Sequence, residues 1–207
     1  MVPKASAVSC VVPARWASIR FPGKMLQPLA GIPIIVHTLR RAEAAGCFAE
    51  ILCLTDSENI LDVVREAGFH AELSGPAANG TDRIASNLGV ISHDLIVNLQ
   101  GDEPIFPSQG LNLICRGLQA DPESVHILVH DRELAPEEAS NPNRCKAGMD
   151  AQGRVLDFYR SQLHNFRGVP QPINHLRLQM GTYGYTKKYL RQYAGLPISP
   201  FELSESH

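Results

Sequence analysis

The stretch AVSCVVPARWASIRFPGK, residues 7–24, decides the fold. Its first part, residues 7–13, is a short continuous apolar run, which is typical of a strand that is covered on both faces of a parallel sheet. Its second part turns polar and carries the cations Arg15, Arg20 and Lys24 together with a Pro-Gly pair. In α/β proteins, ligands bind beyond the carboxyl ends of the strands. The stretch therefore predicts an α/β protein with a ligand site after its first strand.

Three further short apolar runs predict strands. They cover residues 50–55 (EILCLT), 94–100 (DLIVNLQ) and 125–130 (VHILVH). Between the runs lie segments whose apolar residues recur at helical spacing. These segments cover residues 33–45, 57–67, 80–90 and 107–120. The alternation of strand and helix predicts a three-layer α/β fold with a mostly parallel sheet.

The pattern weakens in the last third of the chain. Residues 133–143 (ELAPEEASNPN) and 167–174 (RGVPQPIN) have the composition of polar, proline-containing loops. Residues 150–153 (DAQG) lie between two apolar runs and predict a hairpin turn. We expect a single domain over residues 1–207.

Composition places the chain among folded proteins and excludes two classes of partner. The hydrophobic share is 44% and the charged share 19%, which are ordinary for a chain with a packed core. The 19 Lys and Arg residues against 21 Asp and Glu residues give a net charge of −2. Because neither sign dominates, we expect no nucleic-acid partner and no membrane insertion. No apolar run is long enough for a membrane-spanning helix.

The five cysteines predict a reducing compartment. Their number is odd, and their spacing contains neither a CxxC motif nor a zinc pattern. Most lie in apolar segments, which indicates buried thiols. The amino terminus leads directly into the first predicted strand and lacks the layout of a signal peptide. We therefore expect a cytoplasmic protein.

The cationic loop after the first strand predicts phosphate binding. Arg15, Arg20 and Lys24 supply charge, and backbone amides among small residues supply geometry. The loop contains neither the Walker pattern GxxxxGK[ST] nor GxGxxG. The alternative interpretation is a solvated basic loop. Its place at the end of a strand favours the phosphate site.

The segment after the third strand predicts a metal ligand. It reads QGDEP over residues 100–104, so that Asp102 is delivered by a strand end. A carboxylate in that position is suited to hold a divalent cation on substrate phosphates, and Gly101 permits the close approach of a ligand. The alternative interpretation is a helix cap.

A third segment, NGTDR over residues 79–83, opens a predicted helix. Thr81 and the backbone amides of a helix start can donate hydrogen bonds to an anion or to the edge of a base. The alternative is an ordinary N-cap by Asn79 or Thr81.

These motifs resemble, in the same order and along nearly the whole chain, those of the 3-deoxy-manno-octulosonate cytidylyltransferase (CMP-Kdo synthetase) family. The most specific match is VNLQGDEP, residues 97–104. The other matching segments are PARWASIRFPGKML (13–26), NGTDR (79–83), NPNRCK (141–146), FYR (158–160), GTYGY (181–185) and PFELSE (200–205).

The resemblance implies a GT-A-like, Rossmann-like nucleotidyltransferase fold, CTP as donor, Mg²⁺ as cofactor and a homodimer. It implies that Arg15 and Lys24, with Arg20, bind the CTP phosphates and that Asp102 binds Mg²⁺. The residues that it assigns to cytidine are Gly80, Thr81, Arg83 and Gln100. The residues that it assigns to the acidic sugar are Arg160, Tyr185, Glu202 and Glu205, with Gln179 in place of a family histidine.

The implied reaction converts CTP and 3-deoxy-manno-octulosonate (Kdo) to CMP-Kdo and pyrophosphate, for lipopolysaccharide biosynthesis. The departures from the family pattern, Gln179 and Tyr159 among them, lie on the sugar side. An 8-amino Kdo or a sialic-type acid therefore stays open as acceptor. The resemblance places the sugar side and the dimer contact in residues 131–207.

The family continues through a helix and a last strand that carry a second metal-binding aspartate, for which these 207 residues offer no equivalent. Either these 207 residues are a piece of a longer chain that continues to this aspartate, or the protein is a shortened paralogue that binds CTP without turnover. A nucleic-acid-binding α/β domain is a further alternative, which the net charge of −2 disfavours.

Overall fold

The computed structural model describes residues 7–17, 21–132, 134–160 and 176–197. The chain divides into two compact units. Unit 1 comprises Met1–His126 and Thr182–Leu196, and unit 2 comprises Ile127–Gly181 and Pro197–His207. No helix in the described ranges is long and apolar enough to cross a membrane.

Unit 1 is built on a mostly parallel sheet, as the sequence predicts. Its parallel strands lie in the order β5-β4-β1-β6, and the second half of β10 pairs antiparallel with β6. The bounds are β1 Val8–Ala14, β4 Glu50–Thr55, β5 His70–Leu73, β6 Leu95–Asn98 and β10 Leu176–Thr186. All seven residues of β1 are buried, which explains its continuous apolar run.

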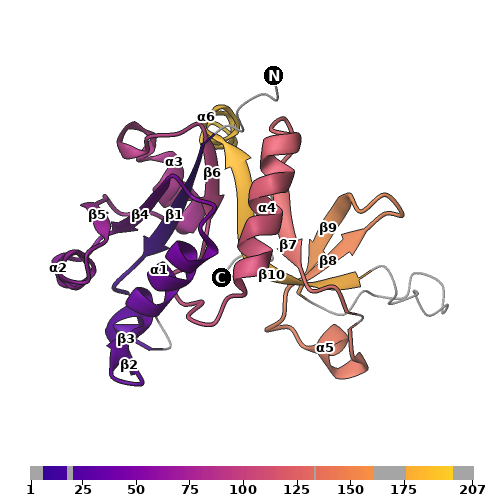
Figure 1. The fold of residues 1–207 in the computed structure, drawn as a ribbon. Coiled ribbons are helices and arrows are strands. Elements are labelled where there is room, and N and C mark those ends of the chain that lie inside the picture. The colour runs from indigo at the N-terminus through magenta and orange to yellow at the C-terminus, as the bar shows by residue number, and fades with distance from the viewer. Residues whose placement is uncertain (1–6, 18–20, 133, 161–175, 198–207) are drawn as a thin grey trace. The chain divides into compact units, whose positions relative to one another are not determined.

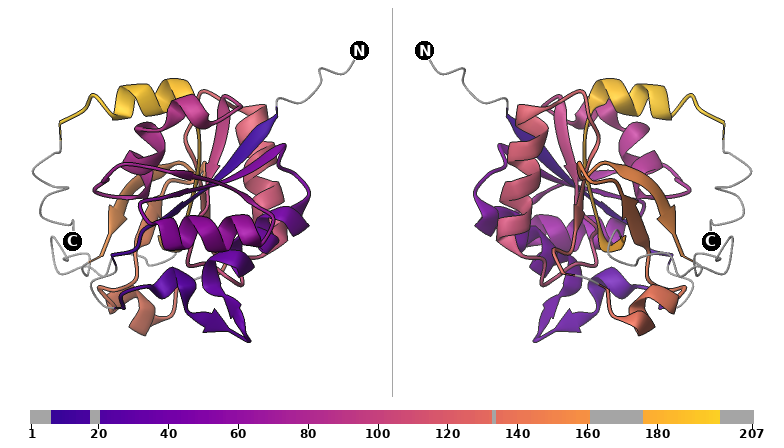
Figure 2. Two further views of the ribbon diagram at one scale, coloured as in Figure 1. Left: turned by 90° about the vertical axis from the view of Figure 1, so that its left-hand side faces the viewer. Right: turned by 90° about the vertical axis from the view of Figure 1, so that its right-hand side faces the viewer.

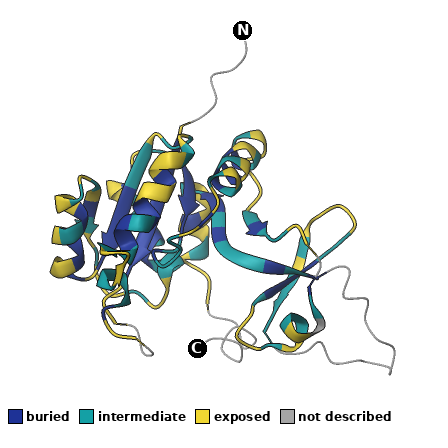
Figure 3. Cartoon of the chain, turned by 60° about the horizontal axis from the view of Figure 1, so that its bottom comes forward, coloured by how far each residue is buried: buried dark blue, intermediate teal, exposed yellow. Residues whose placement is uncertain are grey.

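Helices cover both faces of this sheet and give three layers (Figure 1). The bounds are α1 Ile34–Ala45, α2 Glu58–Glu66, α3 Gly80–Ala85, α4 Ser108–Ala120 and α6 Lys187–Tyr193. Helix α1 packs against α2 and α4 on one face, and α3 packs against α6 on the other. The buried residues of α1, among them Ile35 and Leu39, recur at helical spacing. Figure 3 shows how the buried residues gather in the strands of unit 1.

The segment between β1 and α1 contains elements that the sequence did not predict. A short 3-10 helix, η1 (Lys24–Leu26), leads into a hairpin of β2 (Pro28–Leu29) and β3 (Ile32–Pro33). Ala30 and Gly31 form its two-residue turn with φ values of 50° and 81°, which matches the left-handed turn that hairpins favour. Figure 2 shows the hairpin projecting from the end of unit 1 to which β1 leads. A second 3-10 helix, η2 (Leu88–Val90), follows α3.

Unit 2 contains β8 (Lys146–Met149), β9 (Val155–Tyr159), most of β7 (His126–Val129) and the first half of β10. Strands β8 and β9 form the predicted hairpin, in which Asp150 Oδ1 accepts hydrogen bonds from the Gln152 and Arg154 amides. The prediction of a loop over residues 133–143 is wrong in part, because α5 (Pro136–Ser140) lies within it. The Glu138 carboxylate starts this helix by accepting a hydrogen bond from the Ala135 amide.

Three of the cysteines are buried, as predicted. They are Cys10, Cys53 and Cys115, all in unit 1. Burial raises the pKa of the Cys53 thiol to about 12, with a small opposing effect of Arg83. Burial also raises the pKa of Cys115, whose Sγ lies 3.3 Å from Cys47 Sγ. Such thiols are weak nucleophiles at neutral pH and make no case for cysteine catalysis.

Candidate functional site

The three predicted ligand segments meet at the carboxyl edge of the unit 1 sheet, where β1, β4 and β6 end. Pro13, near the end of β1, is their common neighbour. A methyl group added at Gly80 would stand 2.9 Å from Pro13 Cγ, and one added at Gly101 would stand 3.1 Å from the Pro13 carbonyl oxygen. The backbones of the NGTDR and QGDEP segments therefore approach β1 so closely that a side chain at either glycine would require neighbouring atoms to shift.

The cationic loop and the QGDEP segment meet in an ion pair. Lys24 Nζ donates a hydrogen bond of 2.6 Å to Asp102 Oδ2. The two side chains are 38% and 36% exposed, so that water or a ligand can reach both charges. A partly exposed pair of this kind can exchange its partners for a phosphate and a cation.

Helix α1 holds the QGDEP segment in place. The Thr38 hydroxyl, which is buried, donates a hydrogen bond of 2.9 Å to the Gly101 carbonyl oxygen. Arg41 Nε donates to the Pro104 carbonyl oxygen at 3.3 Å. The carboxylate of Asp102 thus stands on a backbone that is fixed on both sides.

The cationic loop is folded back on itself before η1. Gly23 has a φ of 67°, a conformation that favours glycine, and its amide donates to the Trp16 carbonyl oxygen at 3.3 Å. This closure returns the chain toward Arg15 and directs it into η1, where Lys24 lies. The Pro-Gly pair in the sequence is the signal for this turn.

Glu103 stands beside Asp102 in a less polar environment. Burial, together with the neighbouring charge of Asp102, raises the pKa of the Glu103 carboxyl above its usual value, and Lys24 lowers it in part. Two adjacent carboxyl groups at a strand end concentrate negative charge, which favours the binding of a cation there.

Arg83, which the resemblance assigns to cytidine, points into the protein. Its side chain is 3% exposed, and its Nη2 donates a 2.8 Å hydrogen bond to Asp56 Oδ2. Its Nη1 donates to Ser74 Oγ and, at 3.2 Å, to the Gly75 carbonyl oxygen. These hydrogen-bond partners of the Arg83 guanidinium are all protein atoms. The assignment of Arg83 to cytidine stays a prediction.

Asp56 is a residue that the sequence interpretation missed. It follows β4 directly and precedes the helix predicted over residues 57–67. Its Oδ1 accepts a hydrogen bond of 2.9 Å from the Trp16 backbone amide, while Oδ2 binds Arg83. Its place immediately after a buried strand was the available signal, the same signal that pointed to Asp102.

The remaining nucleotide-side residues lie at the same edge. Arg15 is exposed, and Gln100 and Thr81 are half-buried. A methyl group at Gly80 would lie 3.7 Å from Gln100 Nε2, so that Gln100 borders the start of α3. Arg20 lies outside the described residues.

Tyr185, which the resemblance assigns to the sugar, lies in the core of unit 1. It is 2% exposed and packs with Ile84, Ile96 and Leu190. Burial raises the pKa of its hydroxyl, and Asn98 and Thr81 lie close enough to oppose this effect. The hydroxyl nevertheless has no partner of normal hydrogen-bond geometry within the described part of the chain. A sugar contact by Tyr185 stays a prediction that this burial does not support.

The other residues that the resemblance assigns to the sugar lie in unit 2 or outside the described residues. Arg160 and Gln179 belong to unit 2, where the Gln179 amide donates to the Cys145 carbonyl oxygen at 3.0 Å. The Arg160 carbonyl oxygen accepts a 2.6 Å hydrogen bond from the buried Lys146 ammonium. Glu202 and Glu205 lie outside the described residues.

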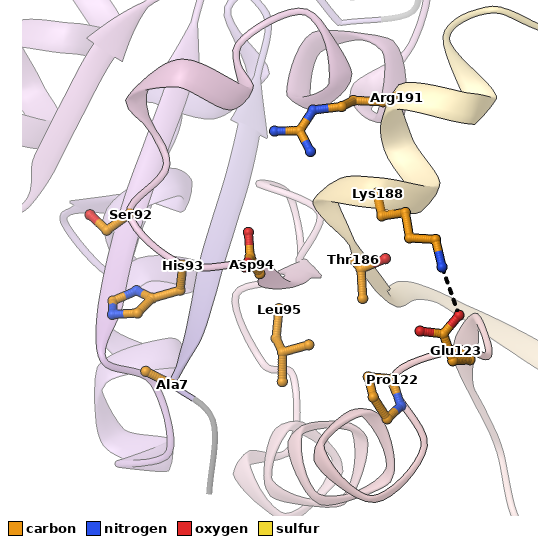
Figure 4. A pocket seen from close by; sticks show the side chains of 10 residues that line it. All are labelled: Ala7, Ser92, His93, Asp94, Leu95, Pro122, Glu123, Thr186, Lys188 and Arg191. Atoms are coloured by element: carbon orange, nitrogen blue, oxygen red, sulfur yellow. Dashed lines mark hydrogen bonds and ion pairs between the residues drawn. The ribbon is translucent and has the colours of Figure 1, made fainter.

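A concave region lies at the amino edge of the same sheet, where β1 and β6 begin. This cavity, of about 690 Å³, is lined on one side by His93 and Asp94 and on the other by Lys188 and Arg191 of α6 (Figure 4). Lys188 is paired with Glu123 at 3.0 Å. The cavity is lined by both acidic and basic side chains, and it lies at the edge of the sheet opposite to the three ligand segments.

Next to this cavity the structure gathers a serine, a histidine and a glutamate. Ser9 Oγ donates to Glu50 Oε2 at 2.5 Å and lies 3.1 Å from His93 Nδ1. A nucleophilic serine would need to be accessible and to bond to the histidine as its base. Ser9 is fully buried and donates to the glutamate, so this cluster is structural.

A mostly parallel sheet covered by helices, with a cationic loop and a strand-end aspartate in contact, is the arrangement expected of a nucleotidyltransferase. A cytidylyltransferase family model matches residues 9–206, and the chain belongs to that family.

Relatives with curated names agree with this placement. The chain is 34% identical over 201 residues to a 3-deoxy-manno-octulosonate cytidylyltransferase from a Nitratiruptor species, a match that covers 94% of this chain and 82% of the relative. It is 35% identical over 202 residues to the protein of the same name from an Anaeromyxobacter species, with 96% and 81% covered.

Solved structures agree as well. A structure of CMP:2-keto-3-deoxy-manno-octonic acid synthetase complexed with CTP superposes with a TM-score of 0.88 and 30% identity, and covers 97% of this chain and 83% of its own. The 4-diphosphocytidyl-2C-methyl-D-erythritol synthase of Anaerococcus prevotii has a TM-score of 0.63 at 11% identity, with 98% and 83% covered, and shares the fold. The expected nucleotidyltransferase fold is thereby confirmed.

Proposed function

We propose that this cytidylyltransferase transfers the cytidylyl group of CTP to 3-deoxy-manno-octulosonate and releases pyrophosphate. The observation that carries the proposal is the contact between Lys24 and Asp102, because it unites the predicted phosphate loop and the predicted metal ligand in one site. The relatives that share about a third of this sequence are named for this reaction.

The proposed mechanism is an in-line attack on the α-phosphorus of CTP. The anomeric hydroxyl of the sugar loses its proton to water and forms the new P–O bond, the bond from the α-phosphorus to the oxygen that bridges to the β-phosphorus breaks, and pyrophosphate leaves with that oxygen. Lys24 moves from Asp102 to the phosphates, and Arg15 adds a second positive charge. Both cations neutralise the charge that grows on the leaving oxygens.

The residues present fit a magnesium ion. Mg²⁺ is usually held by one or two carboxylates together with substrate phosphates and waters. Asp102, half-exposed at a fixed strand end, is such a ligand, and Glu103 adds negative charge beside it. Within the described ranges no group of three or more His, Cys, Asp or Glu could hold a metal alone, which suits an ion that arrives with the nucleotide. When bound, the ion would polarise the phosphate oxygens.

The nucleotide would lie against the backbone of the NGTDR and QGDEP segments. Gly80 and Gly101 leave no side chain between β1 and these segments, and Gln100 and Thr81 offer hydrogen bonds at their surface. The acceptor end rests on the resemblance alone, which assigns it to Arg160, Gln179, Tyr185, Glu202 and Glu205. A cytoplasmic location and a homodimer belong to the same proposal.

Pyrophosphate release from CTP tests the proposal. The assay is run with Kdo, 8-amino Kdo and N-acetylneuraminate as acceptors, with Mg²⁺ and with EDTA. We expect release with Kdo that EDTA abolishes. Release with another acid in place of Kdo would correct the acceptor. CTP binding by calorimetry without release from any acceptor would favour a protein that binds CTP without turnover.

A further inference from the structure

Asp56 joins two segments that belong to different substrate loops. One oxygen of its carboxylate accepts the Trp16 backbone amide at 2.9 Å, in the cationic loop. The other accepts Arg83 Nη2 at 2.8 Å, on the helix that begins with Gly80 and Thr81. Both oxygens are thus occupied by protein donors, and the two donors lie 67 positions apart in the sequence.

The guanidinium of Arg83 is the buried end of this network. The side chain is 3% exposed, whereas Asp56 is 29% exposed. A buried guanidinium requires a counter-charge, because an unpaired charge away from water is costly. Ser74 and Gly75 accept its remaining hydrogen bonds, and the Ser74 amide is itself bonded to the Thr55 carbonyl oxygen at 2.7 Å.

The end of β4 therefore fixes the position of Asp56 from both sides. Thr55 holds the segment with Ser74, and the Thr55 hydroxyl accepts the Ser57 amide at 3.2 Å. The carboxylate between them has little freedom to move. The Asp56 carboxylate accepts the backbone amide of Trp16, the residue after Arg15, where the cationic loop leaves β1.

We propose that Asp56 is a positioning residue that sets the cationic loop against the start of α3, with Arg83 as its buried partner. This inference rests on the proposed function, because the two segments that it aligns are those proposed to bind CTP. Asp56 and Arg83 act through the loops and touch no reacting atom.

The chain contains one tryptophan, and it reports directly on this contact. Trp16 carries the amide that Asp56 accepts, and the residue is 43% exposed. The test compares Asp56→Ala, which removes both contacts, with Asp56→Asn, which keeps an oxygen for the Trp16 amide. Asp62→Asn, a change of an exposed carboxylate on α2, is the matched control.

In Asp56→Ala we expect stronger acrylamide quenching of Trp16 fluorescence and faster hydrogen exchange of the Trp16 amide. CTP binding, followed by the same fluorescence, should weaken about tenfold, as for the loss of one hydrogen bond to a charged group. Asp56→Asn should fall between wild type and Asp56→Ala, and Asp62→Asn should match wild type. A role in folding alone would lower the melting temperature but leave the CTP affinity of folded protein unchanged.

The outcomes separate this inference from the proposed function. Unchanged quenching, exchange and CTP affinity in both Asp56 variants would overturn the inference. Wild-type protein that fails to bind CTP would contradict the proposed function, and the quenching and exchange data would still decide whether Asp56 holds the loop. If Asp56→Ala does not fold, Asp56→Asn provides the same comparison.

Discussion

The two edges of the unit 1 sheet carry polar networks of opposite kinds. At the amino edge, Glu50 is 11% exposed and accepts hydrogen bonds from the Ser9 hydroxyl and from both the hydroxyl and the amide of Ser92. At the carboxyl edge, Asp102 is 36% exposed and pairs with Lys24, which is 38% exposed. The Glu50 carboxylate is occupied by hydrogen bonds from within the protein, whereas the Asp102 carboxylate is accessible to a new partner.

This difference separates a structural cluster from a reactive one. Both edges bring together residue types that are found in active sites. The amino edge even holds Ser9, His93 and Glu50 within contact of one another. Of these three, His93 also lines the cavity in Figure 4. Residue type and proximity are therefore poor guides, and the accessibility of the charged atoms is the better one.

Asp102→Asn should have the largest effect, at the accessible edge. The change keeps the size of the side chain but removes the negative charge that Lys24 and the proposed cation need. We expect pyrophosphate release from CTP to fall by about a hundredfold or more, the effect of losing one group that stabilises a transition state. The measurement is the initial rate at saturating CTP.

The control for this variant comes from the other edge. Glu123→Gln also removes one carboxylate, but its residue is 77% exposed and pairs with Lys188 beside the cavity. We expect wild-type activity from it. Equal losses in Asp102→Asn and Glu123→Gln would show that net charge, and not the carboxyl edge, controls the rate.

Gly101→Ala should have an intermediate effect, through geometry alone. Its methyl group would stand 3.1 Å from the Pro13 carbonyl oxygen and from Ile35 Cδ1, so that β1 and the QGDEP segment must separate. We expect a loss of about 1 to 3 kcal/mol in the free energy of unfolding, as for other overpacked sites. Displacement of Asp102 should also lower kcat about tenfold. Urea unfolding and steady-state kinetics measure the two effects.

Gly89→Ala is the matched control for Gly101→Ala. A methyl group at Gly89 meets no atom within 4 Å, and the residue is exposed in η2, outside the three ligand segments. Stability and kcat should both stay near wild type. A Gly101→Ala variant that behaves like Gly89→Ala would show that the two segments are not held as closely as the structure has them.

Glu50→Gln should have the smallest effect on activity and a clear effect on stability. Burial acts to raise the pKa of Glu50, but hydrogen bonds from Ser9 and Ser92 outweigh it, with a smaller contribution from His93, and the pKa is lowered overall. A carboxyl group whose pKa is lower in the folded state contributes stability above its unfolded pKa, near 4.3, and loses it as the pH falls through the folded value.

The expected result is a pH-dependent difference. At pH 7, Glu50→Gln should be less stable than wild type by about 1 to 2 kcal/mol, because the amide cannot accept all the hydrogen bonds that the carboxylate accepts. The difference should shrink below about pH 4 as wild-type Glu50 becomes protonated. Thermal unfolding between pH 3 and pH 8 measures it. A difference that does not vary with pH would contradict the charge-based explanation.

The sequence allowed the centre of unit 1 to be predicted, but not its last strand. Strands β1, β4 and β6 are buried on both faces, so their continuous apolar runs are unambiguous. Strand β10 was missed because the alternation of apolar residues in its first half, Leu176, Leu178 and Met180, is interrupted by Gly181 and Gly184. Its two halves pair with different strands, β8 and β6, so that no single periodicity applies along it.

The site was predictable where a motif follows a strand and unpredictable where side chains meet across the fold. The cationic loop and the QGDEP segment were found by position, and Lys24 and Asp102 are in contact. The partnership of Asp56 with Arg83 and the Trp16 amide depends on three segments converging, which spacing along the chain does not reveal. The same limit applies to Tyr185, whose burial follows from its packing with Ile84 and Leu190.

Pro13 is in close contact with both the NGTDR segment and the QGDEP segment. Its ring faces Gly80 and its carbonyl oxygen faces Gly101, and both atoms are carried by the same strand. A core substitution that shifts β1 along its axis would therefore move both loops by the same amount and in the same direction. We therefore expect such a substitution to change the spacing between the two segments less than it changes their position relative to the rest of the core.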